Sequence, residues 1–301
     1  MSPYRFSIAI PTFRRPTYLA DLLKDLAQQQ GNFDWSNYEI LICDNDALES
    51  AKGTFHAYSF PGCLRYSYFS VKEQNISLAR NKLVEESSCD AIIFVDDDQR
   101  VNRDFLANVE KFWLERVNQI AGAKFQVNPI FDSSEPKWFR QRRLYSGCLP
   151  ENGSPIVTFA TNGCILKTEL LKHFKFNALF GRTGGEDFEL FLRATKEGYW
   201  FASARSITVL ERVPQERETL VYLLKRDFFR SCTLGHLIRQ GYLERNLRRN
   251  IAIISPSAIA LLPLVPISLI FGRFFFLRTL LLTVRQFGKM LGFFGFRPKA
   301  Y

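Results

Sequence analysis

The sequence predicts an α/β fold, with a mainly parallel central sheet covered by helices on both faces and a separate helical region at the C-terminus. Strand-like and helix-like stretches alternate through the first two thirds of the chain, which is typical of parallel sheets. The formal charge of +10 is unevenly spread, because residues 1–211 contain 25 Lys and Arg against 26 Asp and Glu, whereas residues 212–301 contain 15 against 4. We therefore expect two domains, 1–212 and 213–301, of which the second is basic.

The first elements alternate as this fold requires. Residues 5–10 have the pattern of a buried strand, and Pro11 is expected to stop it. A helix follows from about Pro16 to the glutamine run. The leucines that recur in it at helical spacing are Leu19, Leu22, Leu23 and Leu26. Residues 38–43 form the second predicted strand, which ends in Asp44.

Further strands and helices continue the alternation. We predict strands at residues 64–69, 91–95 and 120–127, a helix that Asn75 caps, and a helix over residues 103–117. The run at 91–95 is apolar throughout, as in strands that are buried on both faces.

The last part of the first domain contains a long connection. Residues 128–155 are rich in Pro, Ser, Asp and Arg and lack periodicity, so we expect a surface loop, which in a compact domain is often functional. Beyond it we predict a strand at 163–167, a helix at 186–196 entered from the glycine-rich turn at 181–185, and a strand at 207–210.

An apolar run without a formal charge occupies residues 251–271. As a helix it would cover about 30 Å, the thickness of a bilayer core. Prolines interrupt it and arginines flank both ends, so a segment that dips into the membrane, or a helical hairpin completed by residues 274–284, is more natural than a straight crossing. We expect region 251–284 to lie at the cytoplasmic face of the cell (inner) membrane, as a peripheral or re-entrant monotopic element. The alternative is a buried core helix packed on the main domain.

The cysteines indicate a reducing compartment. Six of them are scattered along the chain without a CxxC pair or a His at metal-ligand spacing, so neither a zinc site nor a secreted disulfide framework is indicated. The first ten residues lack a long apolar core, and we expect no signal peptide.

Asp96, Asp97 and Asp98 directly follow a predicted buried strand. Adjacent carboxylates repel one another, so the cluster predicts a compensating cation, and such oxygen ligands suit Mg2+ or Mn2+ shared with nucleotide phosphates. In extended backbone Asp96 and Asp98 share one face and Asp97 points away. The alternative is a solvated acidic turn that caps the next helix.

Polar residues also end the first two strands. Asp44 follows the second strand, and Pro11 and Thr12 follow the first. These positions are expected to converge with the aspartates on one crevice at the carboxyl ends of the strands, where α/β sheets bind nucleotides. Neither the glycine fingerprint of dinucleotide sites nor the P-loop sequence is present, so the ordinary dinucleotide and ATPase interpretations lose support.

With these motifs the chain resembles the family 2 glycosyltransferases of the GT-A fold, which is Rossmann-like. Five motifs carry the resemblance, in the family's order, across roughly residues 5 to 212. They are Ile8-Ala9-Ile10-Pro11-Thr12-Phe13-Arg14-Arg15, Ile42-Cys43-Asp44-Asn45-Asp46, Ala79-Arg80-Asn81, Phe94-Val95-Asp96-Asp97-Asp98 and Gly185-Glu186-Asp187-Phe188. The resemblance implies transfer of a sugar from a nucleotide diphosphate donor, a UDP-sugar in the first place, to an acceptor hydroxyl, and we expect inversion at the anomeric carbon.

The resemblance assigns the nucleoside to the first motifs. Pro11, Thr12, Arg14 and Asp44 would hold it, with Asp44 on the uracil ring, and Arg80 would help at the base and ribose. The alternative for Arg80 is an ion pair with a carboxylate on its own helix face.

The resemblance also assigns the acidic residues. Asp96 and Asp98 would form the family's DxD element, in which Asp98 contacts the metal and Asp96 or Asp97 the ribose. Asp187 would be the general base that deprotonates the acceptor, with Glu186 as its neighbour. The alternative for the last two is a charge pair at a helix N-terminus.

The remaining metal ligand departs from the family's pattern. Many relatives place a His after the helix that follows the base, but no His lies between His173 and His236. Glu211 occupies the comparable region, where it either replaces the His or leaves the metal to the aspartates.

The segment Val209-Leu210-Glu211-Arg212-Val213-Pro214 with Arg217, followed by Lys225-Arg226 and Phe228-Phe229-Arg230, resembles bacterial members that build exopolysaccharide repeat units on a polyprenyl carrier. Arg212 and Arg217 would then contact a diphosphate on the donor or the carrier, and the alternative is a solvated basic helix. Trp138 would stack on an acceptor sugar or only anchor its loop. The expected acceptor is a saccharide or a polyprenyl-diphosphate-linked saccharide in surface polysaccharide assembly.

Two other functions fit parts of the sequence. A sugar-phosphate nucleotidyltransferase also uses metal-binding aspartates, but it would carry a glycine-rich loop near the first strand, and residues 11–16 contain no glycine. A non-enzymatic basic membrane or nucleic-acid binder would fit the charge of the tail, but the cluster at 96–98 repels nucleic acid. We therefore expect no nucleic-acid partner.

Overall fold

The computed structural model describes residues 4–132, 137–138, 142–145, 147–242 and 260–298. The chain forms two compact units. The first comprises Met1–Ile130, Ser146–Gly181 and Glu186–Arg212, and the second Phe131–Tyr145, Arg182–Gly185 and Val213–Tyr301. The second unit therefore takes in two short segments from the predicted loop and the glycine-rich turn.

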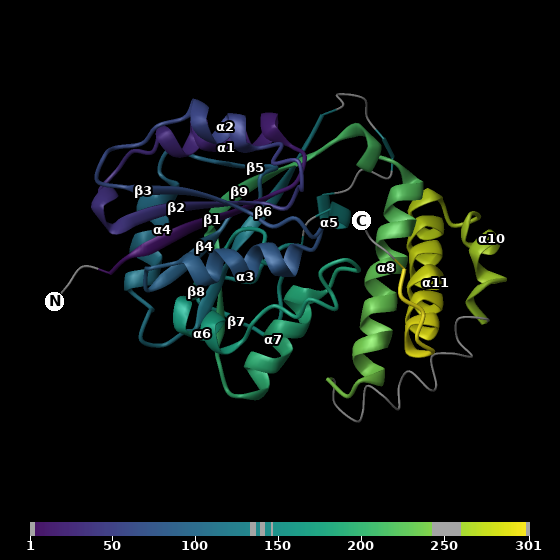
Figure 1. The fold of residues 1–301 in the computed structure, drawn as a ribbon. Coiled ribbons are helices and arrows are strands. Elements are labelled where there is room, and N and C mark those ends of the chain that lie inside the picture. The colour runs from purple at the N-terminus through teal and green to yellow at the C-terminus, as the bar shows by residue number, and fades with distance from the viewer. Residues whose placement is uncertain (1–3, 133–136, 139–141, 146, 243–259, 299–301) are drawn as a thin grey trace. The chain divides into compact units, whose positions relative to one another are not determined.

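The first unit is built on one sheet with the strand order β3-β2-β1-β4-β8-β6-β9-β5, and β7 pairs with β9 (Figure 1). The strands are β1 (Phe6–Thr12), β2 (Tyr38–Asp44), β3 (Arg65–Ser70), β4 (Ala91–Phe94), β5 (Gln99–Val101), β6 (Gly122–Phe131), β7 (Pro155–Ile156), β8 (Cys164–Lys167) and β9 (Phe201–Val213). The pairs among β3, β2, β1 and β4 are parallel, as predicted. Strand β8 is antiparallel to β4 and β6, and β5 and β7 are antiparallel to β9.

Helices cover both faces of this sheet (Figure 1). They are α1 (Pro16–Ala27), α2 (Lys52–Ala57), α3 (Ile76–Glu86), α4 (Phe105–Leu114), α6 (Thr168–His173) and α7 (Glu186–Lys196), with the short 3-10 turn η1 (Trp35–Asn37). Alternate residues of β1 enter two separate cores, because successive side chains of a strand point to opposite faces. Ile8 and Ile10 pack with the leucines of α1 and the apolar face of α4. Ala9 packs with residues of α3, α6 and α7.

Most predicted elements are confirmed, but several boundaries differ; the strand predicted at 207–210, for example, runs from Phe201 to Val213. Asn75 caps α3, because its side chain accepts hydrogen bonds from the backbone N–H groups of Ser77 and Leu78. Pro11 does not stop β1, which continues to Thr12. Strand β1 pairs with β4 only from Phe6 to Ala9. At Pro11 that side of β1 is no longer paired with β4, so the missing N–H of proline is tolerated.

The predicted loop at 128–155 contains more structure than its composition suggested. Strand β6 extends to Phe131, a short helix α5 (Arg142–Tyr145) follows, and β7 begins at Pro155. Residues 133–136, 139–141 and 146 of this loop lie outside the described residues.

The second unit contains the 3-10 turn η2 (Gln215–Arg217) and the helices α8 (Leu220–Arg239), α10 (Leu264–Ser268) and α11 (Arg273–Phe293). Helices α8 and α11 pack closely through glycines. A Cβ atom on Gly292 would lie 1.9 Å from the carbonyl oxygen of Cys232, and one on Gly235 would lie 2.1 Å from the carbonyl oxygen of Lys289. The first part of the predicted membrane region, residues 251–259, lies outside the described residues. Among the described helices, none combines the length and apolar character that a bilayer crossing requires.

Candidate active site

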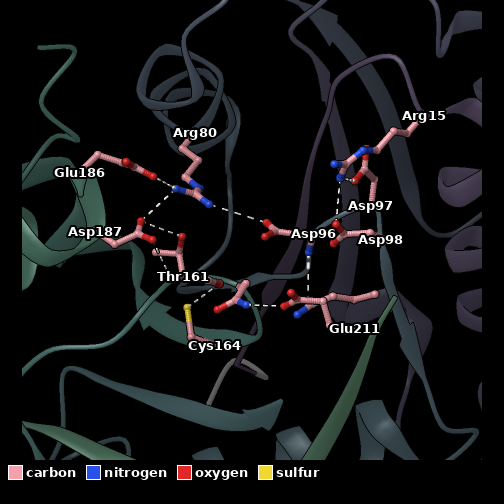
Figure 2. A network of polar contacts seen from close by, with 12 residues as sticks. Arg15, Arg80, Asp96, Asp97, Asp98, Thr161, Cys164, Glu186, Asp187 and Glu211 are labelled. Atoms are coloured by element: carbon pink, nitrogen blue, oxygen red, sulfur yellow. Dashed lines mark hydrogen bonds and ion pairs between the residues drawn. The ribbon is translucent and has the colours of Figure 1, made fainter. Parts of the chain in front are cut away.

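The three aspartates form a turn at the carboxyl end of β4. The backbone N–H of Gln99 donates to the carbonyl oxygen of Asp96 over 3.0 Å, so the chain reverses directly after β4. The prediction that Asp96 and Asp98 share one face is therefore wrong, because it assumed extended backbone. Asp97 and Asp98 both reach Arg15, whereas Asp96 points toward Arg80 (Figure 2).

Arg15 supplies a positive charge to this turn. Its Nη1 donates to Asp98 Oδ2 over 2.8 Å and to Asp97 Oδ1 over 3.2 Å. Thr12, at the end of β1, donates through Oγ1 to Asp97 Oδ2 over 2.8 Å. Burial and the charge of Asp98 nevertheless raise the pKa of Asp97 to about 7. The compensating cation that the sequence predicted is thus supplied in part by the protein itself.

A second cation, Arg80 of α3, joins the aspartate turn to the start of α7. Its Nη1 lies 2.6 Å from Glu186 Oε1 and 2.9 Å from Asp187 Oδ1, and its Nη2 lies 3.7 Å from Asp96 Oδ1. The Arg80 side chain is only 6% exposed, so these interactions act in a medium of low dielectric, where they are strong. The ion pairs are formed with carboxylates that come from other elements.

Asp187 is the most accessible carboxylate of this pair. Its side chain is 15% exposed, against 7% for Glu186. Thr161 holds Asp187 with two hydrogen bonds, from its backbone N–H to Oδ2 over 3.1 Å and from its Oγ1 to Oδ1 over 2.9 Å. Burial and the neighbouring charge of Asp187 raise the pKa of Glu186 to about 7. The two acidic residues therefore have different environments: Asp187 accepts hydrogen bonds from Arg80 and Thr161, whereas Glu186 is more deeply buried.

Glu211 near the end of β9 faces the aspartate turn. Gln99 of β5 pairs with it across the sheet, and burial together with the charges of Asp98 and Asp96 raises the pKa of Glu211 to about 7. Its Oε2 accepts a hydrogen bond from Asn162 Nδ2 over 2.6 Å.

The residues at this turn have the chemistry that a hard divalent cation requires. Asp96 Oδ1 is buried and accepts no hydrogen bond within the described part of the chain, and burial raises the pKa of Asp96. Glu211 and Asp98 repel one another in the same region. Yet no three acidic, His or Cys side chains among the described residues enclose a metal position on their own. Asp96, Asp98 and Glu211 therefore fit a metal site in which oxygens of a bound substrate complete the coordination shell.

The predicted nucleoside residues lie at the ends of β1 and β2 and have protein partners. Asp44 is fully buried, and its oxygens accept from the N–H groups of Asp46 and Ala51 and from the hydroxyl of Tyr68. Arg14 has a φ of 54° and an exposed side chain whose Nε donates to Asp46 over 3.2 Å. Asp44 thus organises the loop after β2.

The predicted diphosphate and acceptor residues divide between the two units. In the first unit, the N–H of Arg212 donates to the carbonyl oxygen of Asp98, and its guanidinium pairs with Asp21 of α1 over 2.8 Å. Arg217 and Trp138 belong to the second unit. The guanidinium of Arg217 lies over the ring of Tyr222, and Trp138 is 36% exposed.

Four residues of this network had no role in the sequence analysis. Arg15 lies in a quoted motif, but its neighbour Arg14 received the assignment. Thr161 and Asn162 precede β8, and a polar pair directly before a predicted strand is a signal that could have been used. Lys124 is a charged residue inside the apolar strand β6, which is a second such signal.

Comparison with known proteins extends these observations. The family model described as glycosyl transferase family 2 matches residues 7–174. The succinoglycan biosynthesis protein ExoM of Rhizobium meliloti (strain 1021) is 29% identical over 241 residues, which cover 77% of this chain and 75% of ExoM. The poly(ribitol-phosphate) beta-N-acetylglucosaminyltransferase TarS of Staphylococcus aureus (strain Mu50 / ATCC 700699) is 23% identical over 108 residues, 36% of this chain and 18% of TarS.

Solved structures agree in fold. The mannosyltransferase PcManGT from Pyrobaculum calidifontis, in complex with GDP-Man and Mn2+, has a TM-score of 0.66 at 14% identity and covers 98% of this chain and 88% of its own. S. aureus TarS 1-349 in complex with UDP-GlcNAc has a TM-score of 0.58 at 13% identity, with 95% and 90% covered. These likenesses establish the GT-A glycosyltransferase fold. Because the family model matches more than half of the residues, the chain belongs to glycosyl transferase family 2.

Proposed function

We propose that this glycosyltransferase transfers a sugar, with inversion, from a UDP-sugar to a hydroxyl of a lipid-linked saccharide in surface polysaccharide assembly. The observation that carries the proposal is the arrangement of the aspartate turn and Asp187 around one buried cation, Arg80. Arg80 lies between the aspartate turn, where the negative charge of the donor phosphates can be stabilised, and Asp187, where a base can act. Membership in the family favours this function over a nucleotidyltransferase and over a non-enzymatic binder.

Asp98, Asp96 and Glu211 are the residues that would hold Mn2+ or Mg2+. Their mutual repulsion and burial support a cation here, as does Asp96 Oδ1, which pairs with Arg80 at 3.7 Å but accepts no hydrogen bond among the described residues. The structure of PcManGT with GDP-Man and Mn2+ supports the same chemistry by analogy of fold. When bound, the ion would stabilise the negative charge on the departing diphosphate.

The uridine is assigned to the ends of β1 and β2. Pro11, Thr12, Arg14 and Asp44 are the proposed contacts, with Asp97 on the ribose side, and the TarS complex with UDP-GlcNAc supports uracil as the base. Asp44 Oδ1 accepts one hydrogen bond in the structure, and an ionised carboxylate oxygen can accept a second one from uracil N3–H. Because Asp44 is fully buried, this contact requires the loop after β2 to move.

Asp187 is the proposed general base. The acceptor oxygen forms a bond to the anomeric carbon on the face opposite the diphosphate, the bond from that carbon to the diphosphate oxygen breaks, and the acceptor proton passes to Asp187. One displacement of this kind inverts the anomeric configuration. Glu186 would assist by sharing Arg80 with the base.

The acceptor is proposed from the relatives and from the second unit. ExoM is a succinoglycan biosynthesis protein, and such assembly on a lipid carrier would place the enzyme at the cytoplasmic face of the inner membrane. In support, α10, the turn after it and the start of α11 expose many large apolar side chains, among them Leu264, Ile267, Ile270, Phe271, Phe274 and Phe275. Exposed apolar patches beside basic residues are typical of membrane-surface elements. Trp138 and Arg217 are the proposed contacts to the acceptor saccharide and its diphosphate.

A donor panel tests the proposal. The full-length protein is incubated with UDP-, GDP- and dTDP-sugars, with and without Mn2+, and NMR follows donor loss and the anomeric configuration of the product. We expect consumption of a UDP-sugar only with the metal, a product of inverted configuration, and loss of activity in Asp98→Ala. The exposed Asp104→Ala is the matched control. Turnover without metal would contradict the metal dependence, a preference for GDP-sugars would contradict the UDP donor, and a product of retained configuration would contradict inversion.

A further inference from the structure

The turn at 161–163 contacts both acidic sides of the site. Thr161 donates two hydrogen bonds to Asp187, and the next residue, Asn162, donates one to Glu211. Figure 2 shows Thr161 beside Asp187. Asp187 lies in the first turn of α7 and Glu211 near the end of β9, so one dipeptide joins carboxylates that come from separate elements.

The turn is fixed to three strands. The N–H of Gly163 donates to Phe94 of β4 over 3.1 Å, and its carbonyl oxygen accepts from Phe125 of β6 over 3.0 Å. Gly163 has a φ of +81°, and a Cβ atom there would lie 2.7 Å from the Val209 side chain of β9. Only glycine allows both the backbone conformation and the close approach. The two preceding side chains are therefore held on a rigid part of the sheet.

A buried lysine holds the side chain of Asn162 in place. Lys124 Nζ donates to Asn162 Oδ1 over 2.9 Å and also contacts the Asn162 carbonyl oxygen. Lys124 is 7% exposed, and burial lowers the pKa of its side chain. With its oxygen bound to Lys124, the Asn162 amide has its Nδ2 group directed at Glu211.

We propose that Thr161 and Asn162 are positioning residues, of which Thr161 orients the base Asp187 and Asn162, anchored by Lys124, orients the metal-side carboxylate Glu211. The inference rests on the proposed function, because it takes Asp187 as the base and Glu211 as a ligand. Residues that orient ligands and bases through hydrogen bonds contribute roughly 10- to 100-fold to metal affinity or activity.

Substitutions of the adjacent residues Thr161 and Asn162 should cause different defects. Asn162→Ala should weaken Mn2+ binding, measured by electron paramagnetic resonance with UDP present and no acceptor, by about 10- to 100-fold. Thr161→Val should lower kcat by a similar factor and leave Mn2+ affinity at the wild-type value, and Thr161→Ser should restore kcat because it restores the hydroxyl. A merely structural role would move both readouts together.

Double substitutions test whether each residue acts through its proposed partner. In a Glu211→Gln background Asn162→Ala should cause no further loss of Mn2+ affinity, and in an Asp187→Asn background Thr161→Val should cause no further loss of kcat. Additive losses, or equal effects of both substitutions on both readouts, would overturn the inference. If Asn162→Ala or Thr161→Val does not fold, Lys124→Met and Thr161→Ala replace them with the same expectations.

Failure of the proposed function has a different signature. If the wild-type protein binds no Mn2+ with UDP, the proposed donor site is wrong. The effect of Thr161→Val on kcat then still tests the inference. If the wild-type protein binds Mn2+ and turns over, but the Thr161 and Asn162 substitutions affect Mn2+ affinity and kcat alike, the inference alone is wrong.

Discussion

Arg80 Nη1 donates to Asp187 Oδ1 over 2.9 Å, although 107 positions separate the two residues in the sequence. The contact brings a buried guanidinium of α3 against the first turn of α7. A general base must be ionised before it can accept a proton, and an adjacent cation favours the ionised form. Since Arg80 also pairs with Asp96, the same cation contacts both the aspartate turn and the proposed general base.

Substitution of Arg80 should damage both stability and turnover. Arg80→Met leaves three carboxylates without their shared cation, and breaking a buried ion pair in this way costs about 3–5 kcal/mol in the free energy of unfolding. Arg80→Lys should lose less, because it keeps the charge but not the fork of donors. Urea unfolding and kcat are the measurements, with the exposed Arg103→Met as control. An Arg80→Met variant as stable and active as the wild type would contradict the role of this network.

Asp187→Asn should separate chemistry from donor binding. The amide retains the shape of the side chain but cannot take a proton, so kcat should fall by about 10²- to 10⁴-fold, the usual contribution of a general base. Calorimetric affinity for the donor should stay at the wild-type value. A variant that turns over normally would remove Asp187 as the base.

Glu186 predicts a pH dependence of stability. Its pKa is raised from 4.5 to about 7, chiefly by burial and then by the charge of Asp187, so the folded state holds the proton more tightly than the unfolded state. Its contribution to the free energy of unfolding is therefore complete below about pH 4.5 and is lost as the pH rises through about 7.

Glu186→Gln should flatten this decline. Melting temperatures between pH 4.5 and 8 should fall less steeply in the variant than in the wild type, because one titrating group has been removed. Glu115→Gln, at an exposed position, controls for the loss of a surface charge. Identical slopes in the wild type and Glu186→Gln would refute the assignment.

The exposed apolar residues of the second unit predict membrane binding. Ile270 is 81% exposed and Phe274 61% exposed, so their replacement by Glu should leave the fold intact and reduce sedimentation with vesicles that contain anionic lipid. Trp200→Glu is the matched control, because Trp200 is 65% exposed and lies in the first unit. Unchanged sedimentation of the Ile270 and Phe274 variants would show that this surface does not bind the membrane.

The parallel half of the fold followed from sequence because its signals are local. Apolar runs such as 91–95 give buried strands, and Asn75 gives a helix cap. The antiparallel strands β8, β6, β9 and β5 could not be ordered in this way, since pairing between distant strands leaves no periodic signal in either one. The end of β1 was misjudged because Pro11 is tolerated only through the local loss of pairing with β4.

The candidate site was predictable in its acidic residues and not in their partners. A run of aspartates after an apolar strand is visible in sequence, but the turn that rotates Asp97 toward Arg15 depends on the hydrogen bond from Gln99. The contacts of Arg80 with Glu186 and Asp187 depend on the tertiary fold. Sequence therefore identified the charges, and the structure determined which cations neutralise them.

The position of a bound metal tests the central claim most directly. Crystals of the full chain soaked with Mn2+ and UDP should show an anomalous manganese peak within coordination distance, about 2.0–2.6 Å, of a carboxylate oxygen of Asp98, with Glu211 or Asp96 beside it and the diphosphate on the same ion. A peak at another place in the molecule, or ordered UDP without manganese at the aspartate turn, would contradict the account.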